Sequence, residues 1–352
     1  MSSFRTTSSV THADGKVAAS LECLGGVTRS TAACSAAAPE SEQSPHHRGL
    51  SLSVDQVDEL FRRHLPGSAG CTSLERIQLG FNNISYVAVS RADGKEYVIR
   101  ATKDSWPSEK VECEMACIRL MRTLTSLPVP TPLCWDASAE QFGCRWILME
   151  KMEGRVMDAQ EFDDLPEAQR AALIDQMVGF LEQLQAHKWE STGSFFPSVT
   201  VAEAEGRAAV TVGPYFDGNH GPFHSAQEFA IGMLRSAVAA AEEKPALKPL
   251  LPHAARTKVL LDHLASGVVQ LPDMPIVAFH GDFSLRNMLV QGEGSELRIS
   301  ALLDWEWGGA KPAYCEWADC SFGDPSAANS RAFQAEAERR GLICQSSPGF
   351  AE

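Results

Sequence analysis

Apolar residues first recur with a regular period between positions 53 and 65. Their spacing of three and four residues is the period of one helix face, and the residues between them are mostly polar. Ser53 is a suitable N-cap, and Pro66 and Gly67 together form a suitable stop. The pattern therefore predicts a short amphipathic helix.

Shorter segments rich in β-branched and aromatic residues come next. The strands predicted from them are Arg76–Leu79, Ser85–Ser90 and Glu96–Thr102. The tripeptide Ala-Asp-Gly at positions 92–94 separates the last two, and this composition favours a hairpin turn. These segments predict an antiparallel sheet.

A helical stretch from Ser108 to Leu124 follows the predicted sheet. Three prolines between Leu127 and Pro132 then force an extended backbone, and a further pair of strands ends in Trp146–Glu150. This part of the chain is thus predicted to run β-β-β-α-β-β.

Beyond Gly154 the periodicity is mainly helical. Helices are predicted at Glu167–His187, Glu228–Glu243 and His253–Leu264. The segment Ser191–Phe223 is rich in glycine and polar residues, so it is expected to form loops over a cleft.

The predicted fold class is α+β with two lobes. An antiparallel-sheet N-lobe is expected at residues 50–153 and a mainly helical C-lobe at residues 154–344. Residues 1–49 are rich in Ser, Thr and Ala and poor in large apolar side chains, so they are predicted to be a disordered leader, and residues 345–352 a tail. The basic residues of the leader leave a mitochondrial transit peptide as an alternative to the cytoplasmic location that we expect.

Composition narrows the choice of partners. The chain of 352 residues carries 31 Lys and Arg against 45 Asp and Glu, a formal net charge of -14, and has no basic block, so nucleic acid is not expected as a partner. The ten cysteines lack the spacing of a zinc site and are expected to be reduced and mostly buried. No apolar run approaches the ~20 residues that a membrane-spanning helix needs, so no membrane partner is expected.

The most informative stretch begins with the apolar strand Ile276–Phe279. It leads into His280-Gly281-Asp282 and a short loop that ends in Asn287, and two strands with a turn-rich connection then lead to Asp304. A hairpin there would return the chain and set Asp304 beside Asn287. Such a cluster of oxygen-bearing side chains suits Mg²⁺. The alternative is that these residues only cap the ends of strands.

These two motifs resemble the aminoglycoside phosphotransferase-like family, whose members are related to the protein kinases and share the H-x-D-x-x-x-x-N loop and a metal-binding Asp after the next hairpin. The resemblance implies a protein-kinase-like two-lobed fold and transfer of the γ-phosphate of Mg·ATP to a hydroxyl of a small molecule. It implies that Asp282 is the catalytic carboxylate, that Asn287 and Asp304 bind Mg²⁺, and that His280 is structural.

The same resemblance assigns nucleotide contacts in the predicted N-lobe. Arg100 stands where the third strand of the family ends in a basic residue that contacts the α and β phosphates, although many kinases have Lys there. Glu114 best matches its acidic partner in the following helix, and Glu112 is the fallback. An exposed strand Arg and a solvated helix acid are the alternatives.

Two further segments resemble nucleotide-binding parts of the family. Gly80 lies between the first two predicted strands, where a phosphate-covering loop is expected, although a plain β-turn explains a single glycine equally well. Trp146–Gly154 resembles the hinge between the lobes, which implies that backbone groups of Glu150 and Met152 bind the adenine. The alternative is a buried edge strand without a ligand.

These residues do not identify the acceptor molecule. An aminoglycoside-, choline- or sugar-like hydroxyl compound is expected, and Glu306 and Glu316 are expected to be solvated loop acids rather than a cation site. One rival is a kinase-fold module that binds nucleotide or protein without turnover, which the Arg at position 100 and the glycine-poor loop would suit. A metal-dependent hydrolase built on His280 and Asp282 would need further ligands at short spacing, which the sequence lacks.

Overall fold

The computed structural model describes residues 51–77, 83–102, 106–198, 210–218, 220–243, 247, 249, 251–316 and 328–342. The predicted leader at 1–49, the loop residue Gly80 and the predicted tail at 345–352 lie outside these ranges.

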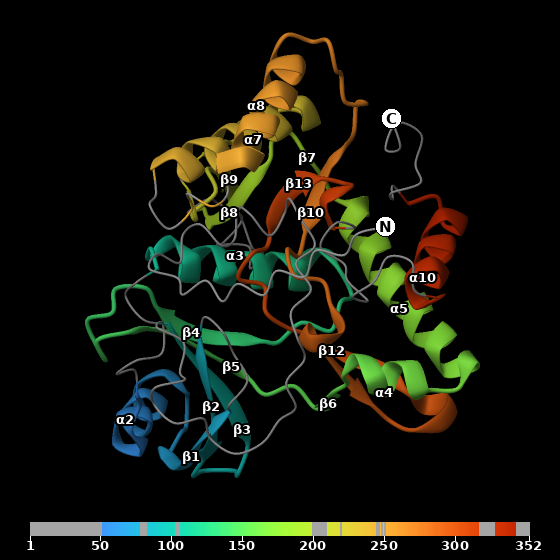
Figure 1. Cartoon of the computed structure of the whole chain (residues 1–352). Coiled ribbons are helices and arrows are strands. Elements are labelled where there is room, and N and C mark those ends of the chain that lie inside the picture. The colour runs from blue at the N-terminus through green and yellow to red at the C-terminus, as the bar shows by residue number, and fades with distance from the viewer. Residues whose placement is uncertain are drawn as a thin grey trace.

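An antiparallel sheet of five strands forms the N-terminal part, in the order β1-β2-β3-β5-β4 (Figure 1). Its strands are β1 (Cys71–Ile77), β2 (Ile84–Ser90), β3 (Glu96–Thr102), β4 (Pro132–Asp136) and β5 (Arg145–Glu150). The predicted first strand was misplaced. β1 begins at Cys71 and not at Arg76, because backbone pairing with β2 extends from Ile77 back to Cys71 although many of the side chains along it are exposed.

Helix α2 (Val54–His64) covers this sheet and confirms the first predicted helix. The side chain of Ser53 accepts a hydrogen bond from the N–H of Gln56, and the side chain of Gln56 accepts one from the N–H of Ser53, so a capping box starts the helix. Leu60 and Phe61 are fully buried in one cluster with residues of the sheet.

Helix α3 (Glu109–Leu124) lies between the N-terminal sheet and the rest of the molecule (Figure 1). Val111 and Met115 pack against the β5 residues Ile147 and Met149. Other apolar residues of α3, among them Met121, belong to the largest core cluster, which is built mainly from the C-terminal part. The helix is therefore buried on two sides.

The C-terminal part holds the remaining elements. They are β6 (Arg155–Val156), α4 (Ala159–Asp164), α5 (Glu167–Ala186), β7 (Lys188–Trp189), β8 (Gly193–Pro197), β9 (Val210–Gly213), α7 (Ala226–Glu243), α8 (Leu251–Ala265), β10 (Ile276–Phe279), β11 (Met288–Gln291), β12 (Arg298–Leu302), β13 (Gly309–Pro312) and α10 (Ala328–Arg339). The three predicted helices of this part are present as α5, α7 and α8, and the α+β class is confirmed.

The loops predicted at Ser191–Phe223 were wrong in part, because β8 and β9 form an antiparallel pair within this segment. These strands complete a five-stranded sheet in the order β7-β10-β13-β8-β9. Phe195 of β8 is fully buried in the main core, so burial of aromatic side chains outweighs the glycine-rich, polar composition of the segment.

All six cysteines in the described part of the chain are free, and five of them are buried. Burial raises the pKa of Cys144 to about 11, so this thiol is unreactive at neutral pH. Within the same described ranges, none of the helices is both long and apolar enough to cross a bilayer.

Candidate active site

Strand β10 is buried along its whole length and delivers His280 into the interior. The ring Nε2 of His280 lies 2.9 Å from the carbonyl oxygen of Leu303, and its Nδ1 accepts the N–H of Asp282 at 3.1 Å. Burial lowers the pKa of His280 to about 4, so the ring is neutral at pH 7 and Nε2 donates to Leu303. His280 thus braces the loop, as the sequence suggested.

Asp282 is fixed through its backbone on both sides. Its N–H is held by His280, and its carbonyl oxygen accepts a hydrogen bond of 2.8 Å from the side-chain amide of Asn287. Its Oδ1 atom pairs with Arg286, whose side chain is 67% exposed. The carboxylate itself is 22% exposed, on a loop whose backbone is hydrogen-bonded on both sides of Asp282.

Glu316 accepts hydrogen bonds from the backbone N–H groups of His280 and Gly281. Its side chain is buried, so the expectation of a solvated loop acid was wrong. The physical reason is that the two N–H groups of this tight turn are withdrawn from water and need an acceptor within the protein.

The hairpin β11–β12 brings the two predicted metal-binding positions together. Met288 pairs with Leu302, and the N–H of Leu303 donates to the carbonyl oxygen of Asn287 at 2.7 Å. Asp304 follows with φ of +65°, a left-handed conformation that Asp tolerates better than most residues. Burial and the neighbouring Glu306 raise the pKa of Asp304.

Arg100 of β3 makes three ion pairs across the site. Its Nη1 lies 2.7 Å from Oε1 of Glu114, and its Nη2 lies 2.9 Å from Oδ1 of Asp304 and 3.1 Å from Oε2 of Glu306. Burial alone would lower the pKa of Arg100, but these carboxylates raise it above its usual range. Glu114, and not the half-buried Glu112, is thus the ion-pair partner of Arg100.

Glu114 is almost completely buried beneath this cluster. Burial raises the pKa of Glu114 to about 7, although Arg100 opposes the shift. The side chain therefore depends on the guanidinium for its charge.

Glu306 was also expected to be solvated, and this was wrong. Its Oε2 atom accepts hydrogen bonds of 2.6 Å from Nζ of Lys110 and 2.6 Å from Nδ2 of Asn83, besides the contact with Arg100. The Oδ1 atom of Asn83 accepts from Lys110 at 3.2 Å and from the hydroxyl of Thr102. Burial of the polar groups is tolerated because each has a partner.

The predicted hinge residues lie at the end of β5. The N–H of Glu150 donates to the carbonyl oxygen of Thr131 at 2.9 Å, and its carboxylate pairs with Lys95 at 2.8 Å. Met152 follows, half-buried and outside the strand. The backbone then passes Gly154 at φ of +129°, where an added Cβ would lie 2.4 Å from Oγ of Ser300.

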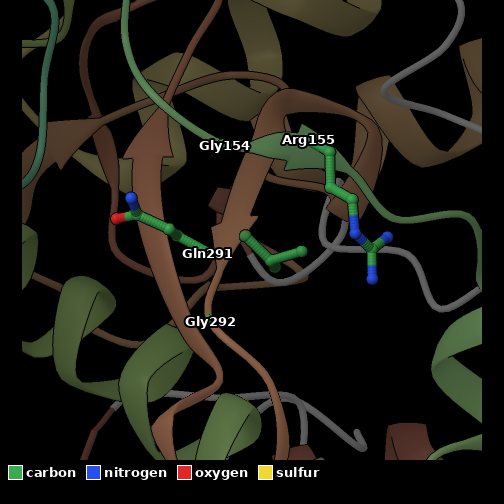
Figure 2. Close-up of a pocket in the computed structure, with 5 residues that line it drawn as sticks. Gly154, Arg155, Gln291 and Gly292 are labelled. Carbon is green, nitrogen blue, oxygen red and sulfur yellow. The ribbon is translucent and has the colours of Figure 1, made fainter.

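An open pocket lies at the ladder between β6 and β11. It is lined by Gly154, Arg155, Val290, Gln291 and Gly292 (Figure 2). Apart from the glycine at the hinge, none of these residues belongs to the segments predicted to bind nucleotide or metal, so the pocket does not define the candidate site.

The sequence analysis did not predict that Asn83 and Lys110 belong to the site, or that Glu306 is buried in it. One signal was present, because Lys110 lies four residues before Glu114 and therefore on the same helix face. The contact between Asn83 and Glu306 joins positions 223 residues apart, and no local pattern reports it.

The sequence matches the model of the family described as "Phosphotransferase enzyme family" over residues 73–346. Among curated proteins, none matches this sequence.

Solved structures with a similar fold include aminoglycoside phosphotransferases and a putative fructosamine-3-kinase from Haemophilus somnus. The gentamicin complex of APH(2'')-IIa is 14% identical, with a TM-score of 0.54 and 83% of each chain covered. ADP-bound APH(2'')-Ib is 14% identical, with a TM-score of 0.52, 82% of this chain and 83% of that chain covered. The GDP complex of wild-type aminoglycoside 2'-phosphotransferase-IIIa is 16% identical, with a TM-score of 0.53 and the same coverage. These likenesses confirm the protein-kinase-like fold.

Proposed function

We propose that this chain, which belongs to the phosphotransferase enzyme family, transfers the γ-phosphate of Mg²⁺-bound ATP to a hydroxyl group of a small-molecule acceptor. The main support for the proposal is one ion-pair cluster, in which Arg100 contacts both Glu114 and Asp304. Phosphoryl transfer needs this combination of a basic phosphate clamp and metal-binding oxygens more than it needs covalent chemistry.

The donor set near Asp304 fits Mg²⁺. Asp304 offers a carboxylate, and Asn287 uses its side-chain N–H on Asp282, which leaves its amide oxygen as the donor atom toward a metal. Both are hard oxygen ligands, and Mg²⁺ commonly takes one or two protein ligands besides phosphate and water. Among the residues that the structure describes, no group of three His, Cys, Asp or Glu could hold a metal by itself, so the nucleotide phosphates would complete the shell. When bound, Mg²⁺ would neutralise charge on the phosphates.

The remaining roles follow from the positions of the side chains. Arg100 would turn from Asp304 to the α and β phosphates, since a guanidinium can hold phosphate oxygens with two N–H groups. Asp282 would orient the acceptor hydroxyl and accept its proton as the new oxygen–phosphorus bond forms. The bond between the γ-phosphorus and the bridging oxygen breaks in the same in-line step, and ADP leaves with that oxygen. Glu150 and Met152 would bind the adenine through backbone groups, and Gly80 would approach the phosphates.

We propose aminoglycoside-, choline- and sugar-like alcohols as the acceptor classes to test. The solved neighbours include a gentamicin complex, and others hold ADP or GDP, so both ATP and GTP belong in the test. A kinase-fold module without turnover is the second candidate, because the two ion pairs of the Arg100 Nη2 atom, with Asp304 and Glu306, must rearrange before this atom can hold phosphate.

Nucleotide-dependent thermal stabilisation tests the proposal. Mg·ATP should raise the Tm of the wild type and of Asp273→Ala, an exposed carboxylate outside the site, but not of Asp304→Ala. ADP formation with the acceptor panel then distinguishes an enzyme from a binding module. No shift of the wild type at saturating Mg·ATP or Mg·GTP would refute the nucleotide site.

A further inference from the structure

Lys110 is a buried cation that the proposed reaction does not use. Only 1% of its side chain is exposed, and its Nζ lies 2.6 Å from Oε2 of Glu306 and 3.2 Å from Oδ1 of Asn83. A buried ammonium group is costly unless it is paired and hydrogen-bonded, and here both conditions are met.

Glu306 receives its hydrogen bonds from three separate elements. Asn83 precedes β2, Arg100 lies on β3 and Lys110 lies on α3, and all three donate to the same Oε2 atom. Glu306 stands two residues after Asp304, so whatever holds Glu306 also limits the movement of Asp304.

The rest of this segment packs against the same helix. An added Cβ at Gly308 would lie 2.4 Å from Sγ of Cys117 in α3. Trp307 contacts the ring of Trp106, just before α3, with ring centroids 5.7 Å apart. The segment from Asp304 to Gly308 is therefore docked on α3 by both polar and apolar contacts.

Arg100 cannot supply this restraint while it serves the nucleotide. Its Nη2 atom contacts both Asp304 and Glu306, and these bonds compete with phosphate oxygens for the same N–H groups. Lys110 has no such second duty, because its ammonium group contacts Glu306 and Asn83 and lies over the ring of Trp106.

We propose that Lys110 is a positioning residue for the metal-binding segment, an inference that rests on the proposed function. Lys110 neutralises Glu306 and ties it to α3, so that Asp304 keeps its place when Arg100 turns to the phosphates. Side chains that support metal ligands from behind commonly change metal affinity by roughly 10–100-fold when they are removed.

The test measures nucleotide affinity by calorimetry with and without Mg²⁺, using ADP and ATP as probes. The variants are Lys110→Met, Lys110→Arg and the double variant Lys110→Met/Glu306→Gln. Lys258→Met is the matched control, because Lys258 pairs with Glu242 at the surface, where both side chains are about half exposed. The free energy of unfolding of each protein is measured in parallel.

Mg²⁺ should strengthen nucleotide binding in the wild type, and Lys110→Met should make this strengthening smaller by roughly tenfold or more. The affinity for nucleotide without Mg²⁺ should stay unchanged. The Lys110→Met variant should also be less stable, because the buried Glu306 loses its closer cation and keeps only the longer contact with Arg100. The double variant should recover stability but not the Mg²⁺-dependent affinity, since it lacks the tether. Lys110→Arg should restore part of that affinity, and the control should match the wild type.

A purely structural role would change stability alone. If the double variant recovers the Mg²⁺-dependent gain together with stability, or if Lys110→Met weakens nucleotide binding equally with and without Mg²⁺, the positioning role is overturned while the proposed function stands. If Lys110→Met does not fold, the double variant decides the question by the same criterion. A wild type that binds neither nucleotide overturns the proposed function and this role together.

Discussion

Asp282 combines an immobile backbone with a carboxylate that reaches the surface. Its N–H and carbonyl group are both held within the loop, while its side chain is 22% exposed and shares one oxygen with Arg286. This arrangement suits a group that must meet an acceptor hydroxyl without contacting the nucleotide. A substitution of Asp282 should therefore change the rate of phosphoryl transfer without changing the affinity for nucleotide.

Asp282→Asn should lower the rate of phosphoryl transfer by about 10²–10⁴-fold, because the amide cannot accept the proton of the hydroxyl. The Kd of Mg·ATP should stay close to that of the wild type, because the backbone contacts of the loop do not involve the carboxylate. Steady-state kinetics and calorimetry measure the two quantities. A large loss of nucleotide affinity would instead place Asp282 among the metal-binding or phosphate-binding residues.

The neutral state of His280 predicts how stability depends on pH. Because its folded-state pKa of about 4 lies below the usual 6.5, the unfolded chain binds a proton first as the pH falls. The contribution of His280 to stability is complete above pH 6.5 and declines toward pH 4, by about 3 kcal/mol. The raised pKa of Glu114 acts with the opposite sign, so the difference between the wild type and His280→Gln isolates the contribution of His280. Urea unfolding across this range measures the decline.

His280→Gln should flatten that decline, although the variant is less stable at pH 7. His263→Gln, at an exposed position of α8, is the control and should keep the wild-type slope. An unchanged slope in His280→Gln would mean that other groups control the acid dependence.

At the residue scale, the sequence predicted what lies in one local motif and missed what depends on distant contacts. Asp282, Asn287 and Asp304 lie on one loop and hairpin, whose register follows from alternating apolar residues. Lys110 and Glu306 meet across 196 positions. Each alone looks like a surface charge, and only the fold shows that both are buried.

The loop that carries Asp282 depends on a close approach between two segments. Gly281 has φ of +91°, and an added Cβ would lie 2.5 Å from Cβ of Trp307 and 2.7 Å from its carbonyl oxygen. Gly94 in the β2–β3 turn has a similar φ of +71°, but an added Cβ there meets nothing within 4 Å. The two glycines share a conformational requirement and differ in the space around them.

Gly94→Ala should lower the free energy of unfolding by about 1–2 kcal/mol, from the left-handed backbone alone. Gly281→Ala should cost about 1–3 kcal/mol more, because Trp307 must move. It should also reduce activity, since Asp282 is the next residue. Denaturant titration of both variants measures the difference, and equal losses would mean that Trp307 yields without strain.

Among the elements, helices and hairpins with regular patterns were predicted well, and β1 and the β8–β9 pair were not. The alternation of buried and half-buried residues in β2 and the helical period of the buried residues in α5 each report one buried face directly. β1 carries Thr, Ser, Glu and Arg along much of its length, so its pairing with β2 leaves little hydrophobic signal. Gly193 and Gly213 weaken the pattern at β8 and β9 in the same way.

At the scale of the whole molecule, α3 joins the two parts. The boundary proposed between residues 153 and 154 follows the chain at the hinge, but the main core contains α3 residues such as Met121 and Leu120 together with α5 and β10 residues. The N-terminal sheet has its own cluster, which includes Leu60. A lobe cut at the hinge would expose one side of α3 to water.

We therefore expect the protein to unfold in a single cooperative transition. Met121→Ala should lower the free energy of unfolding by about 2–5 kcal/mol, because this side chain is fully buried in the main core. Leu60→Ala is the matched variant, since it creates a cavity in the N-terminal cluster far from the C-terminal elements. If α3 couples the lobes, calorimetry should show one transition in each variant, shifted as a whole to lower temperature. Two resolved transitions, of which each variant shifts only one, would show instead that the lobes fold independently and that α3 belongs energetically to one of them.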